Sequence, residues 1–166
     1  MNILNHTDCL LLIDCQYGFV DYSKTRLIYN LNRLTKHFRD RDKPILILEY
    51  TGCGLTLSSI TDILQYYQNK NVIQKNFESG TPKILREYPE ISKLDLTFHV
   101  AGVNWSQCVF KTARDLLRKT NNLNLVLHKY ASNPGFRKCD NIWEDLTQRY
   151  SNRIQIINRS KDYVNK

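Results

Sequence analysis

Short apolar runs alternate along the chain with segments in which apolar residues recur every three or four positions. The runs are DCLLLID (8–14), PILILEY (44–50), NVIQK (71–75), LTFHVAG (96–102), LNLVLHKY (123–130) and RIQIIN (153–158). Runs of this length, rich in Leu, Ile and Val, predict strands that are buried on both faces. Helical spacing lies between them at Leu27, Leu31, Leu34 and Phe38, then at Ile60, Ile63, Leu64 and Tyr67, and later at Ile142, Trp143 and Leu146. We therefore expect strands and helices in strict alternation.

Polar and proline residues predict where several helices begin. Ser23 is placed to cap the first helix, and Thr81 to cap the third, with Pro82 at the first helical position. In GVNWSQCVFKTARDLL (102–117), Asn104 or Ser106 would cap the next helix. Cys108 then falls in the first turn of that helix, where the helix dipole and free N–H groups favour a thiolate.

The alternation predicts an α/β fold, a three-layer doubly wound parallel sheet with helices on both faces. The chain shows no repeat, linker or low-complexity tract, so we expect one domain over residues 1–166. In such sheets, ligands bind beyond the carboxyl ends of the strands.

Composition narrows the classes of function. The net charge is +8, but Lys and Arg alternate with acids, as in KHFRDRDK (36–43), which indicates a solvated basic surface and no specific nucleic-acid site. The five cysteines form no C-x-x-C pair, which fits neither a disulfide framework nor a zinc ribbon and indicates a reducing cytoplasm. No apolar run is long enough for a membrane span, and the first eight residues do not resemble a secretory signal.

Three reactive side chains fall at or just after predicted strand ends: Asp14, Lys75 and Cys108. Each has an ordinary alternative, because Asp14 could cap the next element, Lys75 could be a surface residue and Cys108 could fill space in the core. Together at one edge of a sheet they offer a base, a cation and a nucleophile.

Three separated motifs resemble the isochorismatase-like cysteine hydrolases, which include nicotinamidases and N-carbamoylsarcosine amidohydrolases. LLIDCQYGF (11–19) is similar to the first-strand motif, VIQKNFESG (72–80) to the lysine segment, and HVAGVNWSQCVFKTARDLL (99–117) to the cysteine segment. The resemblance implies an Asp14–Lys75–Cys108 triad, a six-stranded parallel sheet in the order 3-2-1-4-5-6, and a homo-oligomer. It also implies a cis peptide between Val103 and Asn104 that directs the backbone N–H groups of Asn104 and Cys108 at an oxyanion.

The chain departs from the nicotinamidase pattern at the metal site. Nicotinamidases carry an Asp-x-His site after the second strand, whereas LILEYTGCGLTLSS (46–59) contains no histidine, and we predict no metal and no cofactor. His99 and His128 lie within predicted strands and are expected in the core or at an edge. Isochorismatases proper lack the cysteine, so its presence here favours amide-like substrates.

We therefore expect a hydrolase that cleaves a C–N bond of a small amide, ureido or carbamoyl compound through a thioester. Proximity to the triad places Phe19, Tyr50, Phe77 and Trp105 at the substrate pocket, although each could equally be a core residue. Two other functions stay open. One is a binding or scaffold protein for an anionic partner, and the other is a redox-sensing thiol protein in which Cys15 or Cys53 resolves Cys108.

Overall fold

Six parallel strands form one sheet in the order β3-β2-β1-β4-β5-β6, as the sequence motifs predicted. The computed structural model describes residues 6–21, 23–133 and 140–161. The strands are β1 (Asp8–Ile13), β2 (Ile45–Tyr50), β3 (Lys70–Lys75), β4 (Thr97–Gly102), β5 (Asn124–Ser132) and β6 (Ile154–Ile157). Each predicted apolar run contains most of one strand. The reason is that a strand covered on both faces is apolar along most of its length.

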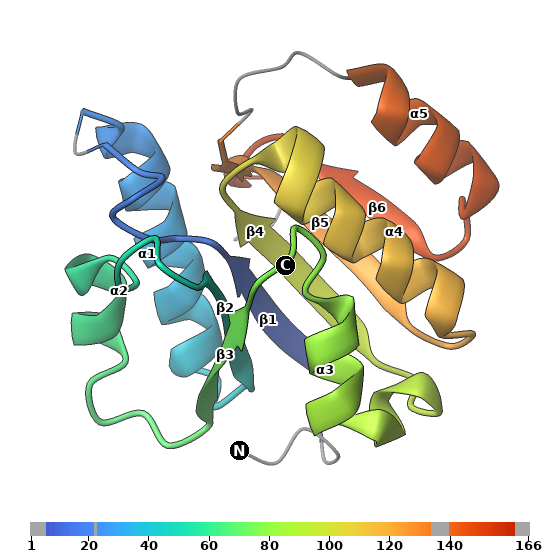
Figure 1. Ribbon diagram of the computed structural model, residues 1–166, viewed down its shortest axis with the longest axis horizontal. Coiled ribbons are helices and arrows are strands. Elements are labelled where there is room, and N and C mark those ends of the chain that lie inside the picture. Colours follow the sequence, from blue (N-terminus) through green and yellow to red (C-terminus); the bar gives the residue numbers. More distant parts are fainter. Residues whose placement is uncertain (1–5, 22, 134–139, 162–166) are drawn as a thin grey trace.

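Helices cover both faces of the sheet (Figure 1). One face carries α1 (Thr25–Arg39) and α2 (Ser58–Ile63). The other face carries α3 (Thr81–Glu87), the short 3₁₀-helix η1 (Pro89–Ser92), the π-helix η2 (Trp105–Val109), α4 (Phe110–Lys119) and α5 (Asp140–Arg149). The three-layer architecture is thus the one expected from the alternation of strands and helices.

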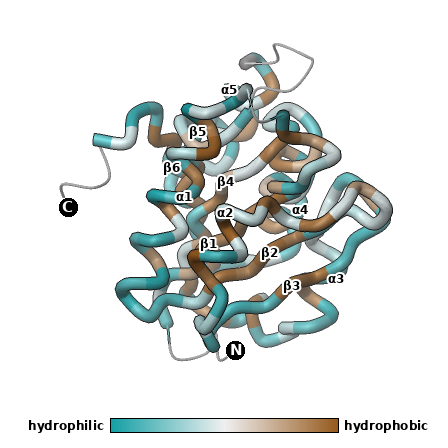
Figure 2. Tube along the Cα trace, turned by 90° about the vertical axis from the view of Figure 1, so that its left-hand side faces the viewer, coloured by the Kyte–Doolittle hydropathy of each residue, from teal (hydrophilic) through white to brown (hydrophobic). Residues whose placement is uncertain are grey.

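The sheet divides the core into two apolar layers. On β1, Leu10 and Leu12 face the layer under α1 and α2, while Cys9, Leu11 and Ile13 face the layer under α3 and α4. Figure 2 shows the strands as hydrophobic segments inside a more hydrophilic outer layer. His99 and His128 are buried in their strands as expected, with His99 Nδ1 lying 3.0 Å from His128 Nε2.

Two predicted caps are wrong. The helix α1 begins at Thr25 without a side-chain cap, because the hydroxyl of Ser23 donates a hydrogen bond to Asp21 in the preceding turn. Gly80 takes the cap position of α3, and the Thr81 hydroxyl donates to the carbonyl of Thr112, which joins α3 to α4.

The second helix is shorter than its spacing predicted, because α2 ends at Ile63 and leaves Leu64 and Tyr67 beyond it. The hydroxyl of Tyr67 instead donates to the carbonyl of Lys43. Among the described residues, no helix combines the length and the hydropathy that crossing a membrane requires.

Candidate active site

Asp14 lies directly after β1, at the carboxyl edge of the sheet. Its backbone adopts a left-handed conformation with φ of 55°, and its N–H donates to the carbonyl of Leu48 at 2.9 Å. The side chain is fully buried. A left-handed aspartate is strained, and such strain is found where the surrounding structure fixes a functional side chain.

Lys75 reaches Asp14 from the last position of β3, across the intervening strand β2. Lys75 is paired in register with Tyr50 on β2, and its ammonium passes over the Tyr50 ring, 4.6 Å from the centroid. The ammonium then donates to Asp14 Oδ2 at 2.9 Å and to the carbonyl of Phe77 at 3.2 Å. Only 1% of the Lys75 side chain is exposed, so the charge is balanced inside the protein by Asp14.

Cys108 lies in η2, which follows β4. The strand β4 neighbours β1 on the side opposite to β2 and β3. Two backbone hydrogen bonds fix the start of this helix against the end of β5, from Trp105 N–H to the Asn133 carbonyl and from Asn133 N–H to the Gly102 carbonyl, both at 3.0 Å. The Val103 N–H donates to the carbonyl of Ile13 at 2.9 Å, beside Asp14. These bonds bring the segment that carries Cys108 to the carboxyl end of β1.

The turn before Cys108 differs from the one that the family resemblance implied. None of the described peptide bonds is cis, so the expected cis bond between Val103 and Asn104 is wrong. The chain turns instead through Asn104, which is left-handed with φ of 61° and ψ of 57°. Cys108 is consequently the fourth residue of a π-helix and does not lie in the first turn of an α-helix, since α4 begins at Phe110.

Burial and charge keep the Cys108 thiol protonated. Desolvation and the nearby Asp14 carboxylate together raise the pKa of Cys108 to about 12, against a smaller opposing effect of the Lys75 charge. The expectation of a resting thiolate is therefore wrong, because the surroundings of the thiol outweigh its place near a helix start. Burial also raises the pKa of Asp14, and the charge of Lys75 opposes this rise.

The two carboxylate oxygens of Asp14 differ in their surroundings. Oδ2 accepts the hydrogen bond from Lys75, whereas Oδ1 is buried and has no hydrogen-bond partner among the described residues. One oxygen is thus fixed by the cation, and the other can accept a proton.

The loop after β2 is held by buried polar side chains that sequence reasoning did not single out. Gln16, two positions after Asp14, donates to the carbonyls of Tyr50 and Gly54 and accepts the Tyr50 N–H at 2.7 Å. Glu49 accepts from both the N–H and the hydroxyl of Thr56, at 2.9 and 2.6 Å. Gln16 and Glu49 stand at the ends of apolar runs, where an unpaired polar group would be costly. This position is the sequence signal by which the two residues could have been identified.

The four predicted pocket aromatics have different environments. Phe19 packs edge-on against Tyr50, with ring centroids 6.3 Å apart, and the Tyr50 ring in turn contacts the Lys75 ammonium. Trp105 is buried and stacks on Trp143 at 4.3 Å. Phe77 is 74% exposed and belongs to the surface, and its backbone carbonyl accepts a hydrogen bond from the triad residue Lys75.

An ion pair near Cys108 affects its thiol, whereas Cys15, one of the two candidate resolving residues, packs in the apolar layer on the opposite face of the sheet. Glu78 pairs with Lys111 on α4, and its negative charge contributes to the raised pKa of Cys108. Cys15 is fully buried and Cys53 is half-buried, and both are free thiols. Within the described part of the chain, no three His, Cys, Asp or Glu side chains lie close enough together to hold a metal ion.

Residues 8–129 match the family model of the isochorismatase domain. The chain belongs to the isochorismatase family. Its fold is similar to that of the MAR1 ribonuclease from Caenorhabditis elegans, with a TM-score of 0.71 and 20% identity over 94% of this chain and 78% of the other.

Two of the solved structures that share this fold are named as amidases. The N-carbamoylsarcosine amidase from Thermoplasma acidophilum has a TM-score of 0.70 and 15% identity over 91% of this chain and 95% of the other. The nicotinamidase/pyrazinamidase from Bacillus subtilis has a TM-score of 0.71 and 17% identity over 92% and 100%. No curated protein matches the chain. The comparisons thus establish an isochorismatase-family hydrolase fold.

Proposed function

We propose that this isochorismatase-family protein is a cysteine hydrolase that cleaves a C–N bond of a small amide, ureido or carbamoyl compound. The observation that carries the proposal is the buried Asp14–Lys75 ion pair of 2.9 Å beside the Cys108 thiol. A base, a cation and a nucleophile in one buried site are the parts that covalent amide cleavage requires. The amidase names of two structures with this fold support the same reaction class.

In the proposed first step, the Cys108 sulfur attacks the substrate carbonyl while its proton moves to Asp14 Oδ1. The raised pKa values of both groups suit this order of events, because the thiol stays neutral until a carbonyl is in place and the carboxylate is a better base than an ordinary aspartate. The carbonyl oxygen becomes an oxyanion, for which we propose the backbone N–H groups of Asn104 and Cys108 as donors.

In the following steps the C–N bond breaks and the thioester is hydrolysed. The leaving nitrogen takes the proton from Asp14, and ammonia or an amine departs. A water molecule then attacks the thioester carbonyl and transfers a proton to Asp14, which returns it to the Cys108 sulfur as the acid product leaves. Lys75 holds Asp14 in place throughout through its hydrogen bond to Oδ2. We assign Phe19 and Tyr50 to the substrate pocket, because the Tyr50 ring contacts the Lys75 ammonium and Phe19 packs against that ring.

The proposal is tested by release of ammonia or amine from a panel of small amides, ureides and carbamoyl compounds. A substrate found on this panel should be hydrolysed at least about a hundredfold more slowly by Cys108→Ala, which removes the covalent route. Cys53→Ala removes a free thiol outside the triad and should retain the activity. Rapid quenching should give an acyl adduct on Cys108 by mass spectrometry. Equal turnover by wild type and Cys108→Ala would refute the mechanism.

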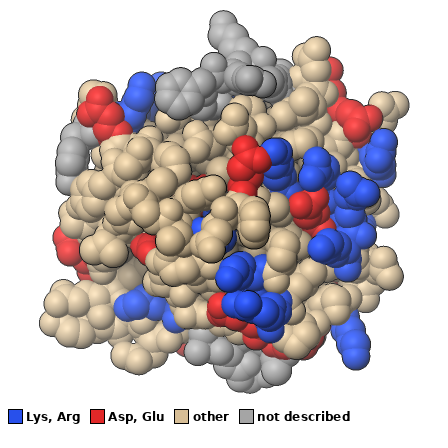
Figure 3. Space-filling view, viewed as in Figure 1, with Lys and Arg blue, Asp and Glu red and all other residues tan. Residues whose placement is uncertain are grey.

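A second candidate function is binding of an anionic partner through the face of α3 and α4. Figure 3 shows Lys and Arg side chains gathered over these helices, and the net charge of the chain is +8. Some of this charge is neutralised locally, since Lys111 pairs with Glu78 and Arg114 with Asp115. Salt-sensitive binding of RNA or heparin, without hydrolysis of any compound on the panel, would favour this function over catalysis.

We also propose that the protein acts in the cytoplasm as a homo-oligomer. The four described cysteines are all free, as in a reducing compartment. Leu55 is 73% exposed and, like Phe77, is a large apolar residue on the surface. Contact with another subunit would remove such apolar surface from water. Light scattering of the full chain tests the oligomeric state.

A further inference from the structure

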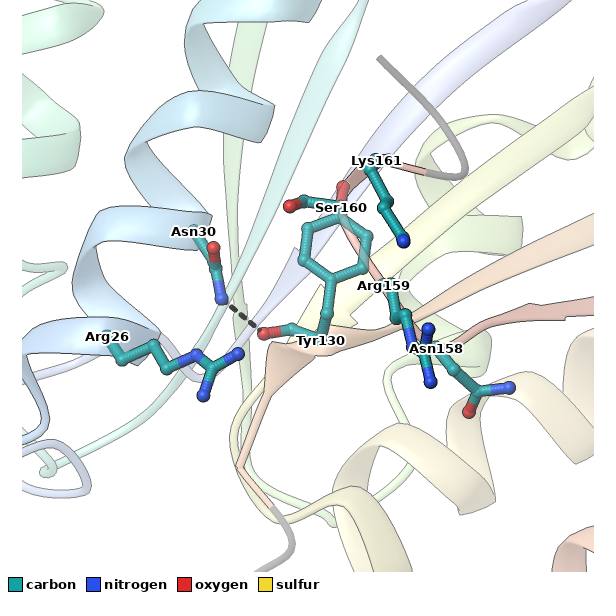
Figure 4. A pocket seen from close by; sticks show the side chains of 7 residues that line it. All are labelled: Arg26, Asn30, Tyr130, Asn158, Arg159, Ser160 and Lys161. Carbon is teal, nitrogen blue, oxygen red and sulfur yellow. Dashed lines mark hydrogen bonds between the residues drawn. The ribbon is translucent and has the colours of Figure 1, made fainter. Parts of the chain in front are cut away.

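A cavity of about 370 Å³ lies on the face of the sheet opposite to Cys108. It opens between the start of α1, the end of β5 and the segment after β6. The described residues that line it are Arg26, Asn30, Tyr130, Asn158, Arg159, Ser160 and Lys161 (Figure 4). None of these residues belongs to the site around Asp14, Lys75 and Cys108.

The cavity is strongly cationic. Arg26 projects from α1, while Arg159 and Lys161 come from the segment after β6, so the charges lie on two sides of the opening (Figure 4). No acidic side chain is among the seven described lining residues. No described residue forms an ion pair with any of the three cations. Three like charges around one hollow repel each other, and a bound anion would relieve that repulsion.

The polar floor of the cavity is held by the rest of the fold. Asn30 is only 8% exposed, and its amide donates to the Tyr130 carbonyl at 2.7 Å, which ties α1 to β5. The Tyr130 ring packs against the ring of His128, with centroids 5.4 Å apart at 87°. Burial raises the pKa of Tyr130 to about 12, so its phenol keeps its proton at neutral pH. The cavity therefore combines cations with neutral polar groups on a rigid base.

We propose that this cavity binds a small molecule that carries a phosphate group, of the size of a nucleoside monophosphate. The guanidinium groups of Arg26 and Arg159 each present paired N–H donors that match the geometry of phosphate oxygens, and Lys161 adds a third positive charge. The volume is that of a small-molecule site and is too small for a folded partner. The Tyr130 ring beside the cations offers an apolar surface for the organic part of the ligand.

Isothermal titration calorimetry of the full chain with AMP, and with adenosine as the uncharged counterpart, tests this proposal. Saturable binding of one AMP per chain, with no detectable heat from adenosine, is expected. Arg26→Gln and Arg159→Gln should each weaken AMP binding by about tenfold or more, since each removes a charge-assisted contact. Both residues are exposed, so both variants should keep the melting temperature of the wild type.

Arg118→Gln is the matched control, because it removes the same charge from an exposed residue of α4, on the opposite face of the sheet. It should change AMP affinity by no more than about twofold. An equal loss of affinity in Arg118→Gln would overturn the proposal in favour of a diffuse basic surface. The proposal would also be overturned if AMP showed no saturable binding while single-stranded RNA bound to the protein.

Discussion

Lys75 on β3 forms a 2.9 Å ion pair with Asp14 after β1, although a whole strand separates the two residues. The lysine spans this gap by lying over the Tyr50 ring on β2, which shields the ammonium and gives it a favourable aromatic contact. Two opposite charges with almost no exposure lie in a low-dielectric interior, where each depends on the other. The pair therefore links the stability of the fold to the geometry of the candidate active site.

A double-mutant cycle should show this dependence. Lys75→Met leaves the Asp14 carboxylate without its cation and should lower the free energy of unfolding by about 3–5 kcal/mol. Adding Asp14→Asn removes the unpaired charge, so the double variant should be less destabilised than the sum of the single variants. Urea unfolding at pH 7.5 measures all four proteins.

The pair between Lys43 and Asp8 is the matched control, because it is 3.4 Å long and partly exposed on both sides. Lys43→Met should cost at most about 1 kcal/mol. Additive effects of Lys75→Met and Asp14→Asn would contradict the buried coupling.

The raised pKa of Cys108 predicts slow alkylation of the native protein at neutral pH. Asp14→Asn removes the negative charge that helps to raise this pKa, so the rise in alkylation rate with pH should begin at lower pH in the variant. Iodoacetamide labelling over a pH series, with mass spectrometry of digests, gives the rate at each cysteine. Cys53, which is half-buried, is the internal reference and should react alike in both proteins. A wild-type Cys108 that reacts as a thiolate at pH 7 would refute the assignment of a resting thiol.

Buried His128 should make the protein less stable in mild acid. Burial lowers the pKa of His128 well below its ordinary value, so the folded protein keeps the ring neutral. The unfolded chain takes up a proton there below about pH 6.5. The free energy of unfolding should therefore fall as the pH drops from 7 to 5, by up to about 1.4 kcal/mol per pH unit from this group. Urea unfolding at several pH values measures the slope, which should become shallower in His128→Leu. Identical slopes for the two proteins would contradict this account.

Gly102 should tolerate no side chain. Its φ is +152°, and an added Cβ would lie 2.1 Å from the backbone oxygen of Ile13, which cannot move without disturbing β1. We expect Gly102→Ala to cost at least about 2 kcal/mol of stability, because it combines backbone strain with a steric clash. Since Gly102 precedes the turn that leads to Cys108, the variant should also lose the proposed hydrolytic activity.

Gly52 supplies the matched control for Gly102. It has φ of +83° with no heavy atom within 4 Å of an added Cβ. Gly52→Ala should cost only about 1 kcal/mol of backbone strain. Thermal melts of the two variants distinguish the steric clash from strain alone, and equal losses would show that the contact with Ile13 has no effect.

Local sequence was sufficient to predict the strands and their parallel arrangement, whereas the order of the strands was implied by the family resemblance. A parallel strand buried on both faces needs an unbroken apolar run, so the runs that contain β1 and β2 could be recognised without any tertiary information. The positions of Asp14, Lys75 and Cys108 at or just after strand ends predicted that they share one edge of the sheet, because all strands of a parallel sheet end on the same side.

Contacts that form only in the folded chain decided the remaining features. Ser23 could cap a helix by its type and position, but a competing bond to Asp21 takes its hydroxyl. The protonated state of Cys108 depends on its burial and on Asp14, neither of which is encoded in the residues around it. The cationic cavity also had no local signal, because Arg26 and Arg159 are far apart in the chain and meet only when α1 and the segment after β6 pack near each other. Backbone patterning is a short-range property of the sequence, whereas burial and charge at a site are set by whatever the folded chain brings beside it.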